Sequence, residues 1–278
     1  MNTEGVESVF NTSFSDIDAT ARPTELVSHQ DRVNAQVAIQ AYKQQAYALL
    51  ELRAGDRVLD VGCGSGDDVQ ALARIVGPTG KATGIDLSET MVAQARARSE
   101  GLQLPVEFQS GDIGRLDFPD GVFAAARADR VLHHLDDPGR ALREMARVVR
   151  PGGRVVVSEP DFDTFVIDHP DRELTRRILT VFAADGARSG GLGRHLYPLF
   201  VEQGFLDIAV LPIPVLVTNL RLAEDVMWIR PTLERAQAVG AVSATEATTW
   251  LADLESLSRA GRFFAAGFGF TVGGRRPR

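Results

Sequence analysis

A nine-residue stretch, Val58–Gly66, limits the possible folds of this chain more than any other part of the sequence. It reads VLDVGCGSG, an apolar run that ends in three glycines at alternate positions, Gly62, Gly64 and Gly66. The pattern predicts a strand and a tight turn, in which glycine lets a ligand lie against main-chain N–H groups without a Cβ in the way. A helix is expected next, because apolar residues recur at helical spacing at Val69, Leu72, Ala73 and Val76.

Two kinds of nucleotide cofactor bind to this geometry. The dinucleotide pattern G-x-G-x-x-G is met by Gly62 and Gly64, but its sixth position is Asp67, and Asp68 follows. We expect two carboxylates at the start of this helix to face and repel a pyrophosphate, although the helix itself tolerates them. A nucleoside cofactor with a cationic amino-acid tail and no phosphate fits better, and S-adenosylmethionine is such a cofactor.

Strands and helices alternate through the first half of the chain. Ser88 and Asp137-Pro138 mark two of the helix starts, since Ser caps helices and Pro is favoured at the first helical position. This alternation implies a parallel, doubly wound sheet. The predicted strands cover about 58–61, 81–85, 105–109, 122–128 and 154–158.

The second half is less regular. Its two strands are expected to be antiparallel neighbours with a helix pair inserted between them, and Pro212 and Pro214 indicate that the first of the two is an edge or bulged strand. Ser243 and Glu246 form the pattern of a capping box. The predicted elements are helices at about 171–184, 194–203, 223–239 and 243–259 and strands at 206–217 and 263–272.

Two acidic residues end the second and third predicted strand units. Ligands in open α/β sheets lie beyond the carboxyl ends of the strands, so Asp86 is placed to accept hydrogen bonds from both hydroxyls of a ribose. Asp112 is placed to accept an adenine amino group, with the backbone N–H of Ile113 as a neighbouring donor. Asp86 suits either cofactor, because both contain a ribose. The predicted adenine contact of Asp112 favours S-adenosylmethionine over a dinucleotide.

These features resemble the class I S-adenosylmethionine-dependent methyltransferases over Gly55–Glu159. The VLHHL stretch at Val131–Leu135 and the turn at Pro151–Gly153 add to the resemblance. It is nearest to the ubiquinone/menaquinone C-methyltransferase-like branch and to bacterial small-molecule methyltransferases. It implies a Rossmann-like α/β fold, with a doubly wound, seven-stranded, mostly parallel sheet and a helical cover. One departure is Ala124, where the family commonly has Asp, but it lies early in the strand.

The resemblance also implies domain limits and site residues. Residues 1–50 would form an N-terminal tail and lid helix, and 51–278 the methyltransferase domain with a helical insertion at about 220–260. The helical region at 24–50 is either a packing helix or a lid with Tyr42 or Gln30 facing the cofactor. Gly62, Gly64 and Gly66 would face the methionine part, Asp86 the ribose, Leu87 and Ile113 the adenine faces, Asp112 the adenine amino group and Ala128 the methionine amino group.

A general base is expected where the loop after the fourth strand meets the end of the fifth. His133 or His134 would lie near Glu159 there, and a carboxylate can orient a histidine and stabilise its charged form. Some related natural-product O-methyltransferases resemble this arrangement. The alternative is that one histidine packs under the sheet and the other caps a helix.

Composition and charge limit the classes of partner that this protein is expected to bind. With 30 basic and 37 acidic residues the formal charge is −7, which disfavours nucleic acid as a partner. The single Cys63 and the scattered His29, His169 and His195 show no metal spacing. The first ten residues lack a secretory pattern, and no apolar run approaches a membrane span, so we expect a cytoplasmic protein without membrane contact.

The sequence predicts an enzyme that transfers the sulfonium methyl group to an O, N or C atom of a small-molecule acceptor. Trp228 and Trp250 are expected to be packing residues or to line an apolar substrate cavity. A scaffold or cyclase that binds S-adenosylmethionine without methyl transfer would share the same motifs. A nicotinamide oxidoreductase is the third possibility, disfavoured by Asp67 and Asp112.

Overall fold

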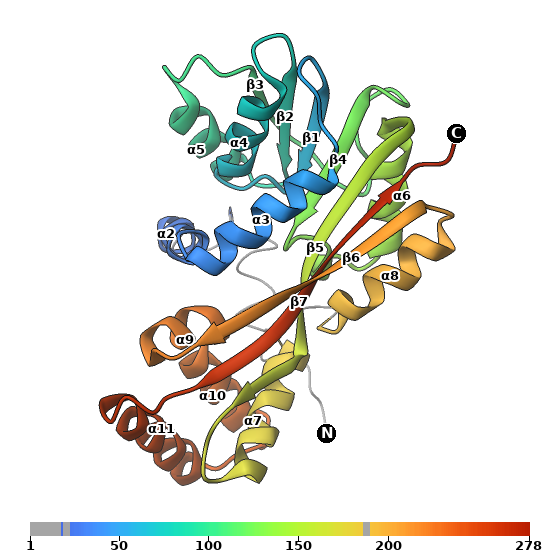
Figure 1. The fold of residues 1–278 in the computed structure, drawn as a ribbon. Coiled ribbons are helices and arrows are strands. Elements are labelled where there is room, and N and C mark those ends of the chain that lie inside the picture. Colours follow the sequence, from blue (N-terminus) through green and yellow to red (C-terminus); the bar gives the residue numbers. More distant parts are fainter. Residues whose placement is uncertain (1–17, 19–22, 186–189) are drawn as a thin grey trace.

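The structure is a computed structural model that describes residue 18 and residues 23–185 and 190–278. Its described part contains one sheet of seven strands in the order β3-β2-β1-β4-β5-β7-β6 (Figure 1). β1 to β5 pair in parallel, and β7 is antiparallel to both β5 and β6. The strands are β1 (Arg57–Val61), β2 (Lys81–Asp86), β3 (Val106–Ser110), β4 (Phe123–Asp129), β5 (Val149–Ile167), β6 (Leu206–Val217) and β7 (Ala265–Arg275).

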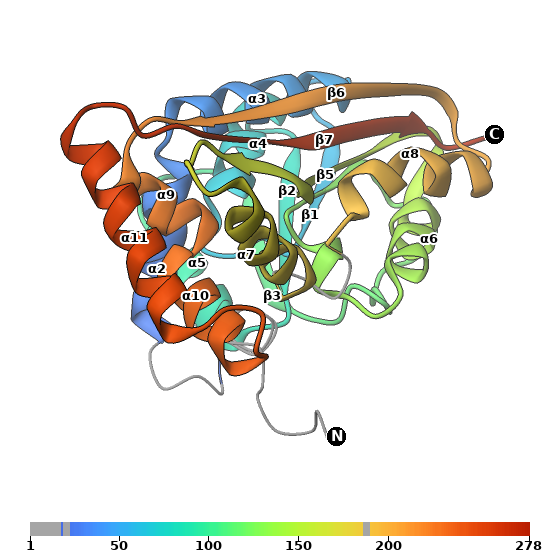
Figure 2. The same ribbon diagram turned by 90° about the horizontal axis from the view of Figure 1, so that it is seen from below.

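Helices cover both faces of this sheet, which confirms the doubly wound α/β prediction. One buried cluster joins α3, α4 and α5 to one face, and another joins α6 and α8 to the other. Figure 2 shows α3 on one side of the strands and α6 and α8 on the opposite side. The helices with their bounds are α2 (Pro23–Asn34), α3 (Val37–Leu49), α4 (Asp67–Val76), α5 (Glu89–Ser99), α6 (Pro138–Val148) and α8 (Leu192–Glu202).

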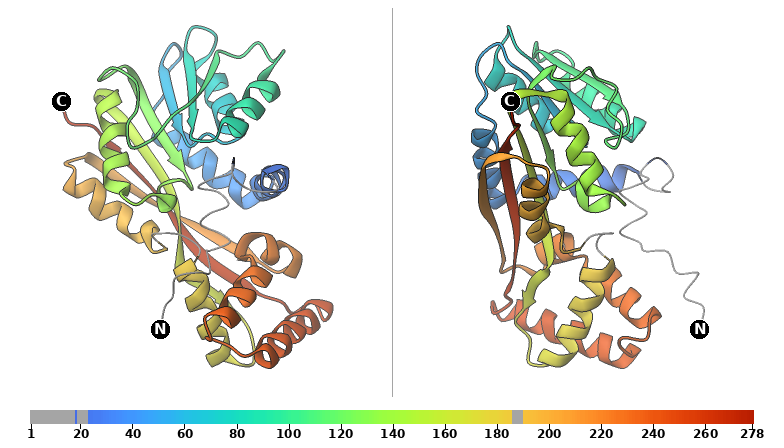
Figure 3. Two further views of the ribbon diagram at one scale, coloured as in Figure 1. Left: turned by 180° about the vertical axis from the view of Figure 1, so that it is seen from behind. Right: turned by 90° about the vertical axis from the view of Figure 1, so that its right-hand side faces the viewer.

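β5, β6 and β7 continue beyond the other strands and carry a second core (Figures 1 and 3). Phe165 of β5, Phe182 of α7 and Trp250 of α11 belong to this cluster, which is separate from the two beneath the parallel strands. Four helices pack there, α7 (Arg172–Asp185), α9 (Leu220–Met227), α10 (Ile229–Ala238) and α11 (Ala244–Arg259). We call this part of the molecule the extension.

Three sequence predictions of element length were wrong. β5 does not end at Ser158, because beyond that residue it pairs only with β7 and so accommodates Pro160 on its free side. The single helix expected at 223–239 is two helices, since Trp228 adopts a left-handed conformation with φ 46° and ψ 49° between them. The helical region at 24–50 is likewise divided, into α2 and α3.

The helix caps predicted from the sequence are formed in the structure. The Ser88 hydroxyl accepts a hydrogen bond from the Met91 N–H and caps α5, and Asp137 caps α6 ahead of Pro138. The capping box of Ser243 and Glu246 is formed at α11. β6 is an edge strand of the sheet, one of the two arrangements that its prolines indicated. The expected tail at residues 1–22 lies outside the described residues, apart from Asp18.

Candidate functional site

A cavity of about 730 Å³ opens where β1, β2 and β4 end. Its walls fall into two parts. The polar half comprises the lining residues at the ends of β1, β2 and β4 and after β3, and the apolar half those of β5, β6 and α9. Six of the predicted cofactor residues line the polar half, namely Gly62, Gly64, Asp86, Leu87, Asp112 and Ile113.

The glycine turn forms one wall of the polar half. The N–H groups of Gly62 and Cys63 donate to the carbonyl oxygen of Ile85, at 2.7 and 3.0 Å, so the turn is held against the end of β2. Gly64 has a φ of +51°, and a Cβ there would lie 2.8 Å from the side-chain nitrogen of Gln30. Gln30 of α2 lines the cavity beside this turn, and a lid role of the N-terminal helices stays a prediction.

Asp86 joins the turn to the next helix. One carboxylate oxygen accepts the Gly64 N–H at 2.8 Å and the other accepts the Ser88 N–H at 3.0 Å. Burial raises the pKa of this carboxyl, and these two N–H groups act in the opposite direction. A carboxylate has about four lone-pair positions, so Asp86 retains acceptor capacity for two hydroxyl groups. The arrangement therefore fits the ribose of S-adenosylmethionine.

Asp112, Leu87 and Ile113 surround the part of the cavity expected to hold adenine. Asp112 is exposed, and one of its oxygens accepts the Gly114 N–H at 2.7 Å, which fixes the loop after β3. Leu87 is exposed and Ile113 is buried. Two apolar side chains beside an acid with a free oxygen are suited to a flat aromatic amine.

Two predicted cofactor residues do not line the cavity. Gly66 lies against the protein instead, since a Cβ there would come within 2.9 Å of Ala95 and Phe108, so its φ of +88° serves the packing of the helix. Ala128 is buried in the core beneath β4. The strand runs one residue further than predicted, and Asp129 and Arg130 line the cavity in its place.

The sequence argument from Asp67 and Asp68 was wrong in its geometry. Neither residue lines the cavity. Asp68 accepts a hydrogen bond from Lys43 at 2.8 Å and forms an ion pair with Arg127 at 3.0 Å, and Asp67 lies 3.8 Å from Arg98. The carboxylates therefore neutralise cations of the protein and do not face a ligand.

A buried ionic cluster supports the polar half from behind. It consists of Lys43 and Tyr47 of α3, Asp60 of β1, Asp68 of α4, and Arg127 and Asp129 of β4. Burial alone would raise the pKa of Asp68, but Arg127 and Lys43 outweigh this and lower it. Burial raises the pKa of Asp60 to about 7, against the effect of Arg127. No pattern in the sequence pointed to Lys43, because its partners lie far along the chain.

Asp129 connects this ionic cluster to the cavity. Tyr42 donates its hydroxyl to Asp129 at 2.8 Å, and Lys43 lies 3.5 Å from the other carboxylate oxygen. Tyr42 itself does not line the cavity, so its side chain orients Asp129 and does not face a ligand directly. The position of Asp129 at the carboxyl end of β4 is the signal that could have identified it.

His133 and Glu159 meet at the border between the two halves. The imidazole Nδ1 of His133 lies 2.5 Å from Glu159 Oε2, and Oε1 of the same carboxylate accepts the N–H groups of Val131 and Leu132 at 3.0 and 2.7 Å. Glu159 is fully buried and His133 nearly so. Because a carboxylate only accepts, Nδ1 carries the proton and Nε2 remains the basic nitrogen.

His134 also lines the cavity, with its ring centroid 3.9 Å from that of His133. The sequence left open which histidine meets Glu159, and the structure places His133 there. Both residues belong to the short 3₁₀ helix at Leu132–His134, which the backbone bonds to Glu159 fix in position.

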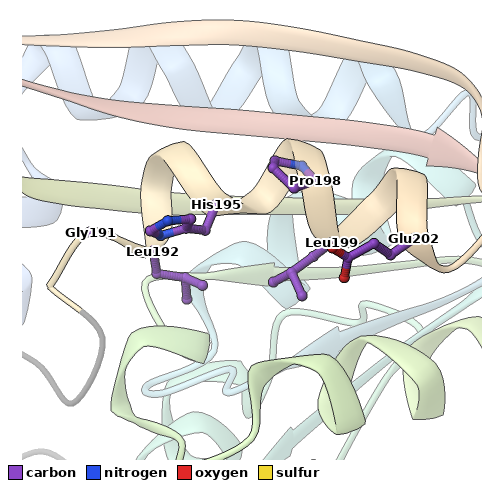
Figure 4. A pocket seen from close by; sticks show the side chains of 6 residues that line it. All are labelled: Gly191, Leu192, His195, Pro198, Leu199 and Glu202. Carbon is purple, nitrogen blue, oxygen red and sulfur yellow. The ribbon is translucent and has the colours of Figure 1, made fainter.

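Of the remaining candidates, Trp228 lines the cavity and the others lie away from it. Trp250 is buried in the extension and donates to Thr175 at 2.8 Å. His169 is buried and accepts the Asp171 N–H, and His195 is exposed beside a second hollow of about 420 Å³ on α8 (Figure 4). The residues that the structure describes form no cluster able to hold a metal ion, and none of their helices is long and apolar enough to cross a membrane.

Comparisons with known proteins agree with this geometry. The methyltransferase-domain family matches residues 52–203. A Streptomyces fradiae protein, described as an uncharacterized 37.1 kDa protein in transposon TN4556, is 41% identical over 89% of this chain and 70% of its own length. The demethylmenaquinone methyltransferase of Bacillus cereus is 34% identical over 49% of this chain.

The match covers 59% of the Bacillus cereus enzyme, less than two thirds of its length. A putative methyltransferase of Bacillus halodurans has the same fold, with a TM-score of 0.59 and 18% identity over 85% of this chain and 99% of its own. The matched residues contain the glycine turn, Asp86, Asp112 and the His133–Glu159 pair. The chain therefore belongs to the class I S-adenosylmethionine-dependent methyltransferases.

Proposed function

We propose that this protein methylates a hydroxyl oxygen of a small-molecule acceptor, with His133 as the general base and Glu159 as the residue that positions it. The observation that carries this proposal is the 2.5 Å contact between His133 and Glu159 at the border of the two cavity halves. S-adenosylmethionine supplies a methyl group on a positively charged sulfur, and the carbon–sulfur bond breaks with its electron pair as the acceptor oxygen forms its bond to carbon.

His133 would take the proton that the hydroxyl gives up. Its Nε2 is the free base, and the imidazolium that forms lies against the Glu159 carboxylate, which stabilises the new charge. Glu159 holds this position through the N–H groups of Val131 and Leu132, so the base cannot turn away. An acceptor carbon or amine that already has a free electron pair would not need this pair of residues.

The polar half would bind the cofactor. Asp86 would accept the ribose hydroxyls, Asp112 the adenine amino group and Asp129 the methionine ammonium group, while Gly62 and Gly64 allow close approach. A nicotinamide cofactor is not supported by the family match. A cytoplasmic location and the absence of a nucleic-acid partner stay predictions.

Turnover of methyl-labelled S-adenosylmethionine with a panel of phenols tests the proposal. Replacing His133 by Ala should lower turnover by about 10²–10⁴, the usual contribution of one general base. Glu159→Gln keeps an acceptor for the two N–H groups but removes the charge, and should also lower turnover. Calorimetric titration with S-adenosylhomocysteine should give wild-type affinity for both variants. Near-normal turnover in both would contradict the assignment of the base.

A further inference from the structure

The apolar half of the cavity differs in chemistry from the half beneath the glycine turn. Its walls come from the extended parts of β5 and β6 and from α9, and Asp225 is the one charged residue among the described residues of these elements that line the cavity. The walls include Phe162, Phe165, Ile213, Val215, Val226 and Trp228. Burying apolar surface is worth roughly 25 cal/mol per Å², so this half favours an apolar ligand.

Charges around the cavity select against an anionic ligand. Five acids line it, Asp86, Asp112, Asp129, Asp136 and Asp225, whereas Arg130 is the one Lys or Arg among the lining residues that the structure describes. Arg130 donates to Asn34 at 2.5 Å and lies 3.8 Å from Asp129, so its guanidinium already contacts groups of the protein. A phosphate or carboxylate group would lose its hydration here without gaining a cation.

An ammonium group is also not favoured in the apolar half. Asp225 is the acid of α9 that lines the cavity, and Arg32 of α2 pairs with it at 3.1 Å. The remaining acids lie in the polar half or, for Asp136, in the loop after the 3₁₀ helix, where the residue is exposed. Compensated charge and apolar walls together leave an uncharged ligand as the best match.

The mouth of the cavity is apolar as well. Val37 at the start of α3 and Leu216 of β6 both line the cavity and are 85% and 66% exposed. Leu216 is in register with Ala266 of β7, which is in register with Val166 of β5, and Val166 is itself exposed. Apolar surface thus continues from the mouth across the outer face of the extension.

We propose that the acceptor is an uncharged, largely apolar molecule that enters between Val37 and Leu216 and fills the apolar half, with its hydroxyl at His133. This inference rests on the proposed function and adds the class of acceptor. It differs from cofactor binding in the residues it uses, because none of the mouth or apolar-half residues is needed for the ribose, adenine or ammonium contacts.

Fluorescence titration with two related probes tests the inference, each in the presence of saturating S-adenosylhomocysteine. N-phenyl-1-naphthylamine is neutral, and 1-anilinonaphthalene-8-sulfonate carries a sulfonate on the same framework. The neutral probe should bind at least about tenfold more tightly, since the sulfonate must be desolvated without a partner. Equal affinities, or tighter binding of the sulfonate, would overturn the inference.

Variants at the mouth locate the binding site. Val37→Arg and Leu216→Arg change exposed side chains and should leave folding intact. Each should weaken the neutral probe and tighten the sulfonate by about two- to fivefold, the range of an exposed ion pair. Val239→Arg is the matched control, because Val239 is 52% exposed but does not line the cavity. Wild-type affinities for both probes in the Val37→Arg and Leu216→Arg variants would contradict the proposed entrance.

Cofactor binding separates this inference from the proposed function. If S-adenosylhomocysteine binds and the neutral probe does not, the acceptor class is wrong and the cofactor assignment stands. If S-adenosylhomocysteine itself fails to bind in calorimetry, the proposed function fails independently of the probes.

Discussion

The polar half of the cavity is built from backbone N–H groups and carboxylates at strand ends, whereas the apolar half is built from aliphatic and aromatic side chains of the extension. In the polar half, position decides function. Asp86 must meet the N–H groups of both Gly64 and Ser88, and moving it by one residue would break both bonds. In the apolar half, size and hydrophobicity are sufficient, and Val215 or Val226 could be exchanged for similar side chains at small cost.

This difference explains how one molecule can keep a fixed cofactor site beside a variable acceptor site. The polar half rests on the parallel strands and on the buried ionic cluster. The apolar half rests on the second core around Phe165, Phe182 and Trp250, which shares no members with the clusters beneath the parallel strands. α2 contacts both sides, through Asp31 to Arg98 of α5 and through Arg32 to Asp225 of α9.

The largest effect is expected in the ionic cluster. Asp68→Asn removes one of the two acids that Lys43 and Arg127 share and leaves them with Asp129, and breaking a buried pair costs about 3–5 kcal/mol of unfolding free energy. Asp60→Asn should cost much less, because burial raises the pKa of Asp60 to about 7 and the native carboxyl is largely protonated below that pH. Urea unfolding of both variants measures the contrast. Equal losses would show that the two acids are equivalent.

Asp60 should also make the stability of the folded protein fall as the pH rises. The native state retains a proton on Asp60 that the unfolded chain loses above its usual pKa of 3.8. The unfolded state therefore binds fewer protons between pH 3.8 and about 7, and this residue makes the protein less stable as the pH rises through that range. The Asn variant should show a flatter profile than wild type. A profile unchanged by the substitution would contradict the raised pKa.

A smaller effect is expected where the cofactor is bound. Asp86→Ala removes the carboxylate, and each charge-assisted bond to a hydroxyl contributes about 1.5–3 kcal/mol, so affinity for S-adenosylhomocysteine should fall about tenfold to a hundredfold or more. Binding of N-phenyl-1-naphthylamine should not change. Leu222→Ala, in the apolar half, should show the reverse pattern. If either variant lost affinity for both S-adenosylhomocysteine and the neutral probe, the two halves of the cavity would not be independent.

The smallest effect is expected at the contact between α2 and α9. Arg32 is largely exposed, so Arg32→Ala should change the unfolding free energy by only about 0.2–1 kcal/mol. Hydrogen exchange in α2 should nevertheless become faster, because its ion pair with α9 is lost. Adding S-adenosylhomocysteine should slow that exchange in wild type. Identical exchange of α2 with and without ligand would contradict the lid interpretation.

Much of the polar half could be predicted from the sequence because its signals are local. The glycine turn, Asp86 and a histidine, His133 or His134, beside Glu159 follow from strand ends and the rule that ligands lie at their carboxyl edge. Ala128 was selected over Asp129 because the end of β4 was placed one residue early. Gly66 shares the spacing of its neighbours, and only packing against Phe108 distinguishes it.

The extension and the ionic cluster could not be predicted in the same way. β5 continues through Pro160 because β7 pairs with it from a distant part of the chain. The left-handed conformation of Trp228 is set by tertiary packing, since no glycine or asparagine marks it. Lys43 meets Asp68 and Asp129 only once α3 lies on the sheet, and isolated residues on a helix carry no sign of such partners.

The most direct test of this account is a crystal structure of the protein with S-adenosylhomocysteine. We expect the ribose hydroxyls on Asp86, the adenine between Leu87 and Ile113, and the sulfur toward His133, with the apolar half left open for the acceptor. Density for the ligand in the apolar half, without contact to Asp86, would contradict the division of the cavity on which the proposed function depends.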